Sequence, residues 1–144
     1  ILVKISRGSI HNARMLSFQS IEDIMNTIEK LTTTVIGKDP QKWRNFTSHY
    51  SRVFNANQLD FDRQLNFIII WLQGANKLRQ NLVSGFERTG LHSRMISFNE
   101  KFPNANIYKI ILCIEEVKSL ARQNLYMPLI LLNMLLDIQE LIYE

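Results

Sequence analysis

Apolar residues recur every three or four positions along most of the chain, which is the spacing of amphipathic helices. The clearest example predicts a helix over residues 18–35, with an inward stripe of Ile21, Ile24, Ile28, Leu31 and Val35. The same period predicts four further long helices, over residues 39–54, 59–86, 104–121 and 128–142, and a short one over 93–101. No alternating strand pattern interrupts them, and Gly and Pro are few. We therefore expect an all-α fold, a compact bundle of about five amphipathic helices.

The length of the chain, 144 residues, fits one domain. Residues 1–16 contain Lys4, Arg7 and Arg14 and no acid, and we interpret them as a basic N-terminal arm. Residues 17–144 then form a single helical-bundle domain. Because the chain begins with Ile, we expect a processed mature protein or an excised fragment. Lys4 interrupts the first apolar residues at once, so no signal peptide can be recognised.

Two apolar runs stand out, over residues 67–72 and 126–136. Both are shorter than the roughly 20 residues that cross a bilayer. The first nearly encircles its helix, which is typical of a helix at the centre of a bundle. An inward face set by Leu129, Leu132 and Leu136 could not bury all of the second, because successive helical residues point 100° apart. From the remainder we predict four membrane-contacting apolar residues, Ile130, Leu131, Met134 and Leu135.

The charge of the chain is positive, with a formal net charge of +4 and an isoelectric point of about 9.4. Basic side chains attract a protein to anionic lipid headgroups, and exposed apolar groups can then insert. We predict that the bases in contact with a membrane are Arg7, Arg14, Lys42, Arg44 and Arg52. The alternative is an ordinary solvated helical surface.

The residue types of common catalytic and metal sites are not arranged for that chemistry. His11, His49 and His92 lack metal-ligand spacing, and Cys113 is the single cysteine, so we expect no metal, cofactor or internal disulfide. No phosphate-binding glycine loop or serine nucleophile elbow is present, and the protein is expected not to be an enzyme. Bases and aromatics intermix near Trp43, but without a recognised nucleic-acid motif we expect no nucleic acid. The glycosylation triplet at Asn45 lies inside a predicted helix, which argues against its use.

The layout of the chain resembles the abalone sperm acrosomal family of lysin and its eighteen-kilodalton sister protein. Lys42-Trp43 precedes a long helix, Arg88-Thr89 follows it, and Tyr126-x-Pro128 precedes Met134 in a Met-rich C-terminal segment. The spacing between these points agrees over most of residues 20–140. No single motif is diagnostic, so the resemblance depends on layout, length and helical pattern together.

The resemblance implies a lysin-like helical bundle that is secreted from the sperm acrosomal vesicle and acts in fertilization. Lysin opens the egg envelope by stoichiometric binding, but its surface is far more basic than that of this chain. The sister protein, which promotes gamete membrane fusion, is the better match. We therefore expect a fusogen that binds and perturbs membranes, with anionic lipid as partner. A lysin-like binder of an egg-coat glycoprotein and a helical scaffold that docks partner helices stay open, as does a homodimer.

Overall fold

The computed structural model describes residues 18–143, except Lys38 and Asn124, and the side chains from Glu22 onward. These residues form helices and no strand, which confirms the all-α prediction. The helices of the described part are α3 (Phe18–Ile36), α4 (Pro40–Ala56), α5 (Gln58–Arg79), α6 (Gly90–Lys101), α7 (Ile107–Ala121) and α8 (Met127–Ile142). The expected arm over residues 1–16, with Arg7 and Arg14, lies outside the described residues.

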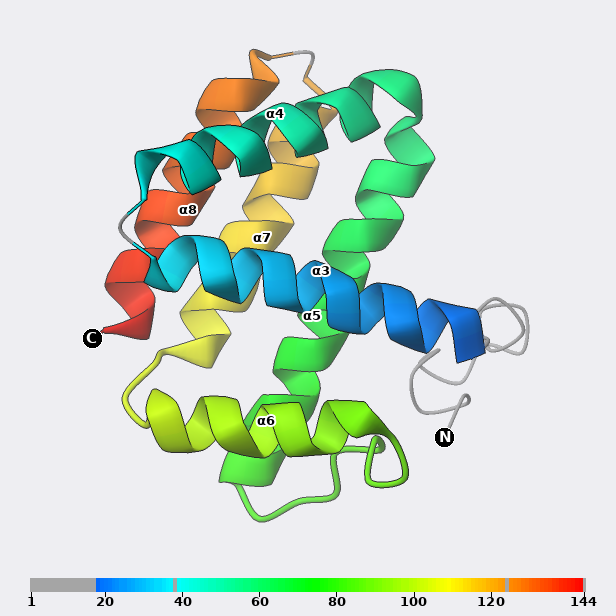
Figure 1. The fold of residues 1–144 in the computed structure, drawn as a ribbon, viewed down its shortest axis with the longest axis vertical. Helices are drawn as coiled ribbons and strands as arrows, with labels where there is room; N and C mark the ends of the chain where they lie inside the picture. The colour runs from blue at the N-terminus through cyan, green and yellow to red at the C-terminus, as the bar shows by residue number, and fades with distance from the viewer. Residues whose placement is uncertain (1–17, 38, 124, 144) are drawn as a thin grey trace.

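The helices are arranged in two crossing layers (Figure 1). α3, α4 and α6 run across the view in front of α5, α7 and α8, which follow the long axis of the molecule. α5 packs against α3, α4, α6 and α7, while α8 packs against α7, α4 and α3. α4 therefore lies over both α5 and α8, with α3 beside it.

Local capping fixes where α4 and α5 begin. The Asp39 carboxylate accepts a hydrogen bond from the Gln41 backbone N–H at 2.9 Å, with Pro40 at the first helical position, as the sequence predicted. Asn57 separates α4 from α5, and its side chain accepts from the backbone N–H groups of Leu59 and Asp60 at 3.0 and 3.2 Å. The predicted break near residues 55–57 is thus a one-residue connection, Asn57, between two helices that cross at a steep angle.

Three predicted boundaries were wrong. α5 ends at Arg79 rather than near residue 86, because Asn81 adopts a positive φ of 59° and the chain enters a loop. α6 starts at Gly90, earlier than predicted, because the Thr89 hydroxyl accepts from the Leu91 N–H at 3.3 Å. α7 is capped by Asn106, whose side chain accepts from the Lys109 N–H at 3.1 Å, and not by Asn104.

The loop after α5 places one apolar residue, Phe86, in the core. The Glu87 carboxylate accepts hydrogen bonds from the backbone N–H groups of Ser84, at 2.7 Å, and Gly85, at 3.0 Å. Desolvation raises the pKa of Glu87, but hydrogen bonds from its own backbone N–H, from Gly85 and from Ser84 together outweigh it and keep the pKa below its ordinary value. The turn that they stabilise places Phe86 in the core, so its apolar character was correctly noticed but assigned to the wrong element.

The apolar run of α5 forms the centre of the core, as predicted. Within residues 67–72 every side chain is buried except Ile70, which is half-buried. Gly74 of α5 faces Met95 of α6, and a Cβ at this position would lie only 2.6 Å from the terminal methyl of Met95. A helix that packs against four others needs apolar residues on nearly all sides, which explains the run without a membrane.

Candidate functional site

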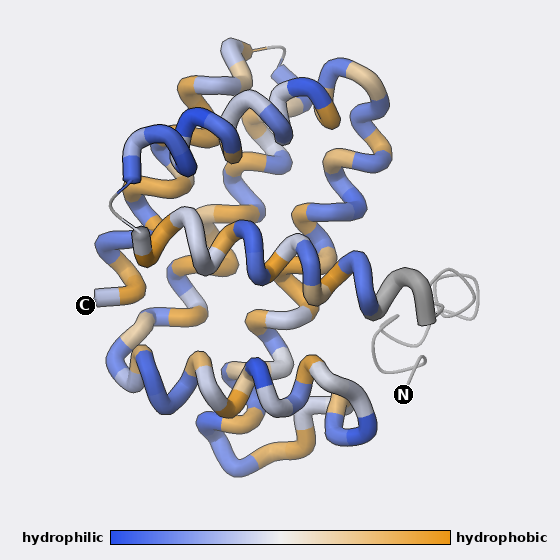
Figure 2. The backbone as a smooth tube through the Cα atoms, in the orientation of Figure 1, coloured by the Kyte–Doolittle hydropathy of each residue, from blue (hydrophilic) through white to orange (hydrophobic). Residues whose placement is uncertain are grey.

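The described bases of the predicted membrane-contacting set lie along α4. Lys42, Arg44 and Arg52 are all exposed, and Figure 2 shows that the outward side of α4 is mostly hydrophilic. Among residues 22–143 that the structure describes, none of the three forms an ion pair. These cations are therefore free to meet an external anion.

The four apolar residues predicted to contact a membrane are in the core instead. Ile130, Leu131, Met134 and Leu135 are all buried, so their prediction as surface residues was wrong. The physical reason is that α8 is covered on one side by α7 and on another by α4 and α3, so two adjacent arcs of its surface face inward. These residues contribute to stability and cannot reach a lipid while the fold is intact.

The exposed apolar residues of α8 are three other leucines, Leu129, Leu132 and Leu136. They recur at intervals of three and four, so they form one outward stripe. This stripe was predicted to face inward, and that prediction was wrong. Because α8 is apolar on both faces, periodicity alone could not decide which face is buried.

Two of these leucines line a groove between α4 and α8. The groove has a volume of about 690 Å³ and is lined by Asp39, Pro40, Trp43, Arg44, Thr47, Tyr126, Pro128, Leu129, Leu132 and Gln139. The Trp43 indole N–H donates to the Gly37 carbonyl at 3.2 Å, which fixes the ring against the α3–α4 turn. Arg44 and Asp39 add charge to a lining that is otherwise mainly apolar. The groove thus combines the Arg44 cation with exposed apolar side chains.

Further exposed apolar side chains lie at one end of the molecule. The α4–α5 turn and the α7–α8 turn are both at the upper end in Figure 1. Leu59, on the first turn of α5, is 83% exposed, and Tyr126, just before α8, is 73% exposed. Leu125 and Arg122 of the same α7–α8 turn are exposed as well. Of these residues, Tyr126 also lines the α4–α8 groove.

A second groove lies on the other side of α4, toward α3. Its volume is about 830 Å³, and its lining includes Lys30, Lys42, His49 and Arg52. Burial, followed by the nearby charges of Lys30 and Arg52, lowers the pKa of His49 below its ordinary value. α4 is therefore a ridge between an apolar groove and a basic groove.

The other titratable groups in the described part of the chain are less suited to metal binding or nucleophilic chemistry. Across the described part of the chain, no three His, Cys, Asp or Glu side chains are grouped so that they could hold a metal ion. The Cys113 sulfur lies 4.0 Å from an Asp137 carboxylate oxygen, and burial together with the negative charges of Asp137 and Glu116 raises the thiol pKa to about 11. A thiol of this kind is a poor nucleophile at neutral pH. None of the helices described is long and apolar enough to cross a membrane.

Comparison of the chain with protein-family models, with curated proteins and with solved structures finds no match.

Proposed function

We propose that the protein binds membrane surfaces that contain anionic lipid, perturbs their packing without catalysis, and so promotes membrane fusion. The observation that supports this proposal is the α4–α8 groove, where Arg44 lies among exposed apolar side chains. Cations attract the protein to headgroups, and apolar groups then add roughly 0.8 kcal/mol for each methylene that leaves water.

The residues that insert are revised from the sequence prediction. Tyr126, Leu129 and Leu132 replace the buried residues of α8, with Leu125 beside them at the α7–α8 turn. Lys42, Arg44 and Arg52 keep the role that the sequence predicted, because all three are exposed along α4. The apolar side chains are fixed on helices and a short turn, so binding requires no unfolding of the core.

The resemblance to the sperm acrosomal family supplies a setting for this activity. In that setting the protein is secreted from the acrosome, and the two membranes are those of sperm and egg. The apolar groups of the α4–α8 groove are side chains on helix surfaces, so the protein would bring the membranes together by lying on them.

The test compares two leucines of equal exposure at opposite ends of the molecule. Leu129 in the groove is 53% exposed, and Leu82 in the α5–α6 loop is 54% exposed. We expect Leu129→Ser to weaken binding to vesicles of mixed neutral and anionic lipid about fourfold or more, and Leu82→Ser to leave it unchanged. Binding of the wild type should also weaken as salt rises, because screening removes the initial attraction. Equal effects of the two substitutions, or no vesicle binding, would exclude this membrane surface.

The concave shape of the α4–α8 groove favours a second function, the docking of a partner. An apolar groove between two helices can receive an amphipathic helix of another protein, including an egg-coat glycoprotein in the family setting. Failure of the wild type to bind any vesicle, with the groove intact, would leave this function as the better explanation.

A further inference from the structure

The groove between α3 and α4 gathers basic and polar side chains from two helices. Its lining comprises Asn26, Glu29, Lys30, Thr33, Thr34, Lys42, Asn45, Phe46, Ser48, His49, Tyr50 and Arg52. We propose that this groove is a binding site for a doubly charged phosphate group. We infer this site from its own residues. Two of its bases, Lys42 and Arg52, also belong to the proposed membrane-contacting set, but the site does not require membrane binding by the α4–α8 groove.

The positive charges of the site have no ion-pair partner in the part of the chain that the structure describes. Lys42 and Arg52 come from α4 and Lys30 from α3, and none of them forms an ion pair within the described residues. Glu29 is the one acid among the lining residues, and its carboxylate lies 3.6 Å from Arg94 of α6. The groove therefore keeps an excess of positive charge, which a bound anion would neutralise.

Neutral hydrogen-bonding groups accompany the charges. Asn45 keeps its amide N–H₂ available, because its side-chain oxygen accepts from Gln41 Nε2 at 2.9 Å. Ser48, Thr33 and Asn26 add further hydroxyl and amide groups to the lining. Phosphate offers several acceptor oxygens, and both charged and neutral donors can bind them. A carboxylate would use fewer of these donors, and an apolar ligand would leave the charges without a partner.

His49 lies among these bases, and its pKa depends on the charge in the groove. Its ring is nearly perpendicular to that of Tyr50, at 87° and with centroids 4.8 Å apart, so its position is fixed on one side. Burial disfavours the protonated imidazole, and the charges of Lys30 and Arg52 act in the same direction. A bound dianion would oppose these effects and raise the pKa of His49.

The size of the groove admits more than an isolated ion. Its volume of about 830 Å³ leaves room for a phosphate together with the group that it is attached to. Free phosphate and the phosphate monoester headgroup of a lipid offer the same dianionic oxygens. The two sources differ only in the group attached to the phosphate, so one experiment can separate them.

The experiment titrates the folded chain with inorganic phosphate at constant ionic strength, and follows the His49 imidazole by NMR with His49→Gln to assign its signal. We expect phosphate to raise the pKa of His49 by roughly half a pH unit or more, because opposite charge within a few ångströms favours the protonated ring. In the double variant Lys30→Gln, Arg52→Gln we expect the affinity for phosphate to fall roughly tenfold or more. Its His49 pKa without phosphate should rise, since two like charges are gone.

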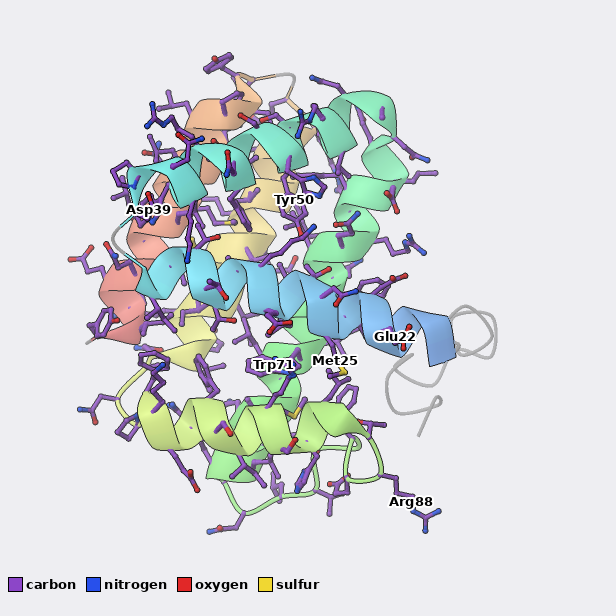
Figure 3. All side chains as sticks on the ribbon, viewed as in Figure 1. Glu22, Met25, Asp39, Tyr50, Trp71 and Arg88 are labelled. Carbon is purple, nitrogen blue, oxygen red and sulfur yellow. The ribbon has the colours of Figure 1, made fainter. Side chains whose placement is uncertain are left out.

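The matched control removes one charge far from the groove. Arg88 is exposed at the opposite end of the molecule from α4 and points away from it (Figure 3). Arg88→Gln should leave the phosphate response of His49 unchanged. A wild type whose His49 pKa does not move with phosphate, or a double variant that responds as the wild type does, would overturn the site. Circular dichroism spectra confirm that each variant is folded.

The last part of the experiment distinguishes free phosphate from the phosphate headgroup of a lipid. Vesicles with phosphatidic acid, a phosphate monoester, are compared with vesicles of equal charge made with phosphatidylglycerol, a diester. Preference for phosphatidic acid that is lost in the double variant assigns the site to a lipid headgroup. Equal binding of both vesicles, with the inorganic phosphate response intact, supports the site and assigns it to a soluble phosphate.

Discussion

A hydrogen bond joins Arg79 of α5 to Asn99 of α6 and holds both side chains in one orientation. Arg79 Nε donates to the Asn99 side-chain oxygen at 2.8 Å, and Asn99 Nδ2 donates to the Ala75 carbonyl at 3.0 Å. The remaining guanidinium nitrogens donate to the backbone carbonyls of Ala105, at 2.6 Å, and Phe102. One side chain at the end of α5 thus gives a second donor to two carbonyls between α6 and α7, each of which also accepts a backbone N–H.

This arrangement predicts a large cost for a shape-conserving change at Arg79. Arg79→Met keeps the aliphatic stem, leaves the Asn99 oxygen without its donor and removes one of the two donors of each carbonyl, so we expect the free energy of unfolding to fall by about 1–3 kcal/mol. Arg79→Lys should recover only part of it, since an ammonium cannot reproduce the planar fork. Urea unfolding measures all three proteins. A loss below about 0.5 kcal/mol for Arg79→Met would show that water replaces the guanidinium freely.

Adjacent leucines of α8 should behave differently when they are substituted. Leu131 is fully buried, so Leu131→Ala should lower the free energy of unfolding by about 2–5 kcal/mol. Leu132 is exposed in the α4–α8 groove, and Leu132→Ser should change stability by no more than about 0.5 kcal/mol while it weakens vesicle binding. Denaturant unfolding and vesicle sedimentation give the two readouts. Equal losses of stability would place both leucines in the core.

The thiol of Cys113 should react slowly. Its pKa is raised to about 11 from an ordinary value of 9.0, so the thiolate fraction near neutral pH falls about 100-fold. We expect a thiol reagent to modify the folded chain about that much more slowly than the urea-unfolded chain. Asp137→Asn should speed the reaction, because it removes one of the two negative charges that raise the pKa, and Glu140→Gln serves as its control. A native rate equal to the unfolded rate would contradict the burial of the thiol.

The stability of the protein should fall as the pH drops below the ordinary pKa of His49. Because the pKa of His49 in the folded protein is lowered from 6.5, the unfolded chain binds a proton first. The contribution of His49 to the free energy of unfolding is complete above pH 6.5. It is lost as the pH falls through the pKa that His49 has in the folded protein. His49→Gln should therefore flatten the dependence of the unfolding midpoint on pH between about 7 and 5. An identical slope in both proteins would contradict this assignment.

The fold was largely predictable because most helices have one apolar face. The stripe of α3 and the cap at Asp39 are local signals, and both gave the correct elements. The end of α5 was missed because Phe86 continues the helical period by chance while packing into the core from a loop. Period alone cannot separate a helical residue from a loop residue that reaches the same core.

Only the charged residues of the candidate site could be predicted from the sequence, and the exposed leucines of α8 could not. Lys42 and Arg52 could be assigned to the surface because a buried unpaired cation is costly. Leu129 and Leu131 differ in nothing that a sequence displays, since both are leucines in an apolar run. Which of them is exposed depends on where α4 crosses α8, and that crossing is set by contacts between distant segments. Beside this crossing, the Gln139 amide of α8 donates to the Val35 carbonyl of α3 at 3.1 Å, a contact between distant segments that the sequence did not predict.

The position of α5 between α3, α4, α6 and α7 has a consequence for how the molecule comes apart. No single helix of those four can detach without uncovering the apolar residues of α5, so partial opening costs nearly as much as complete unfolding. Backbone amides in the middle of α5, near Ile68 and Ile69, should accordingly exchange with deuterium only through cooperative loss of the whole structure. With such an all-or-none core, the proposed membrane binding would use only side chains that the folded molecule already exposes to water.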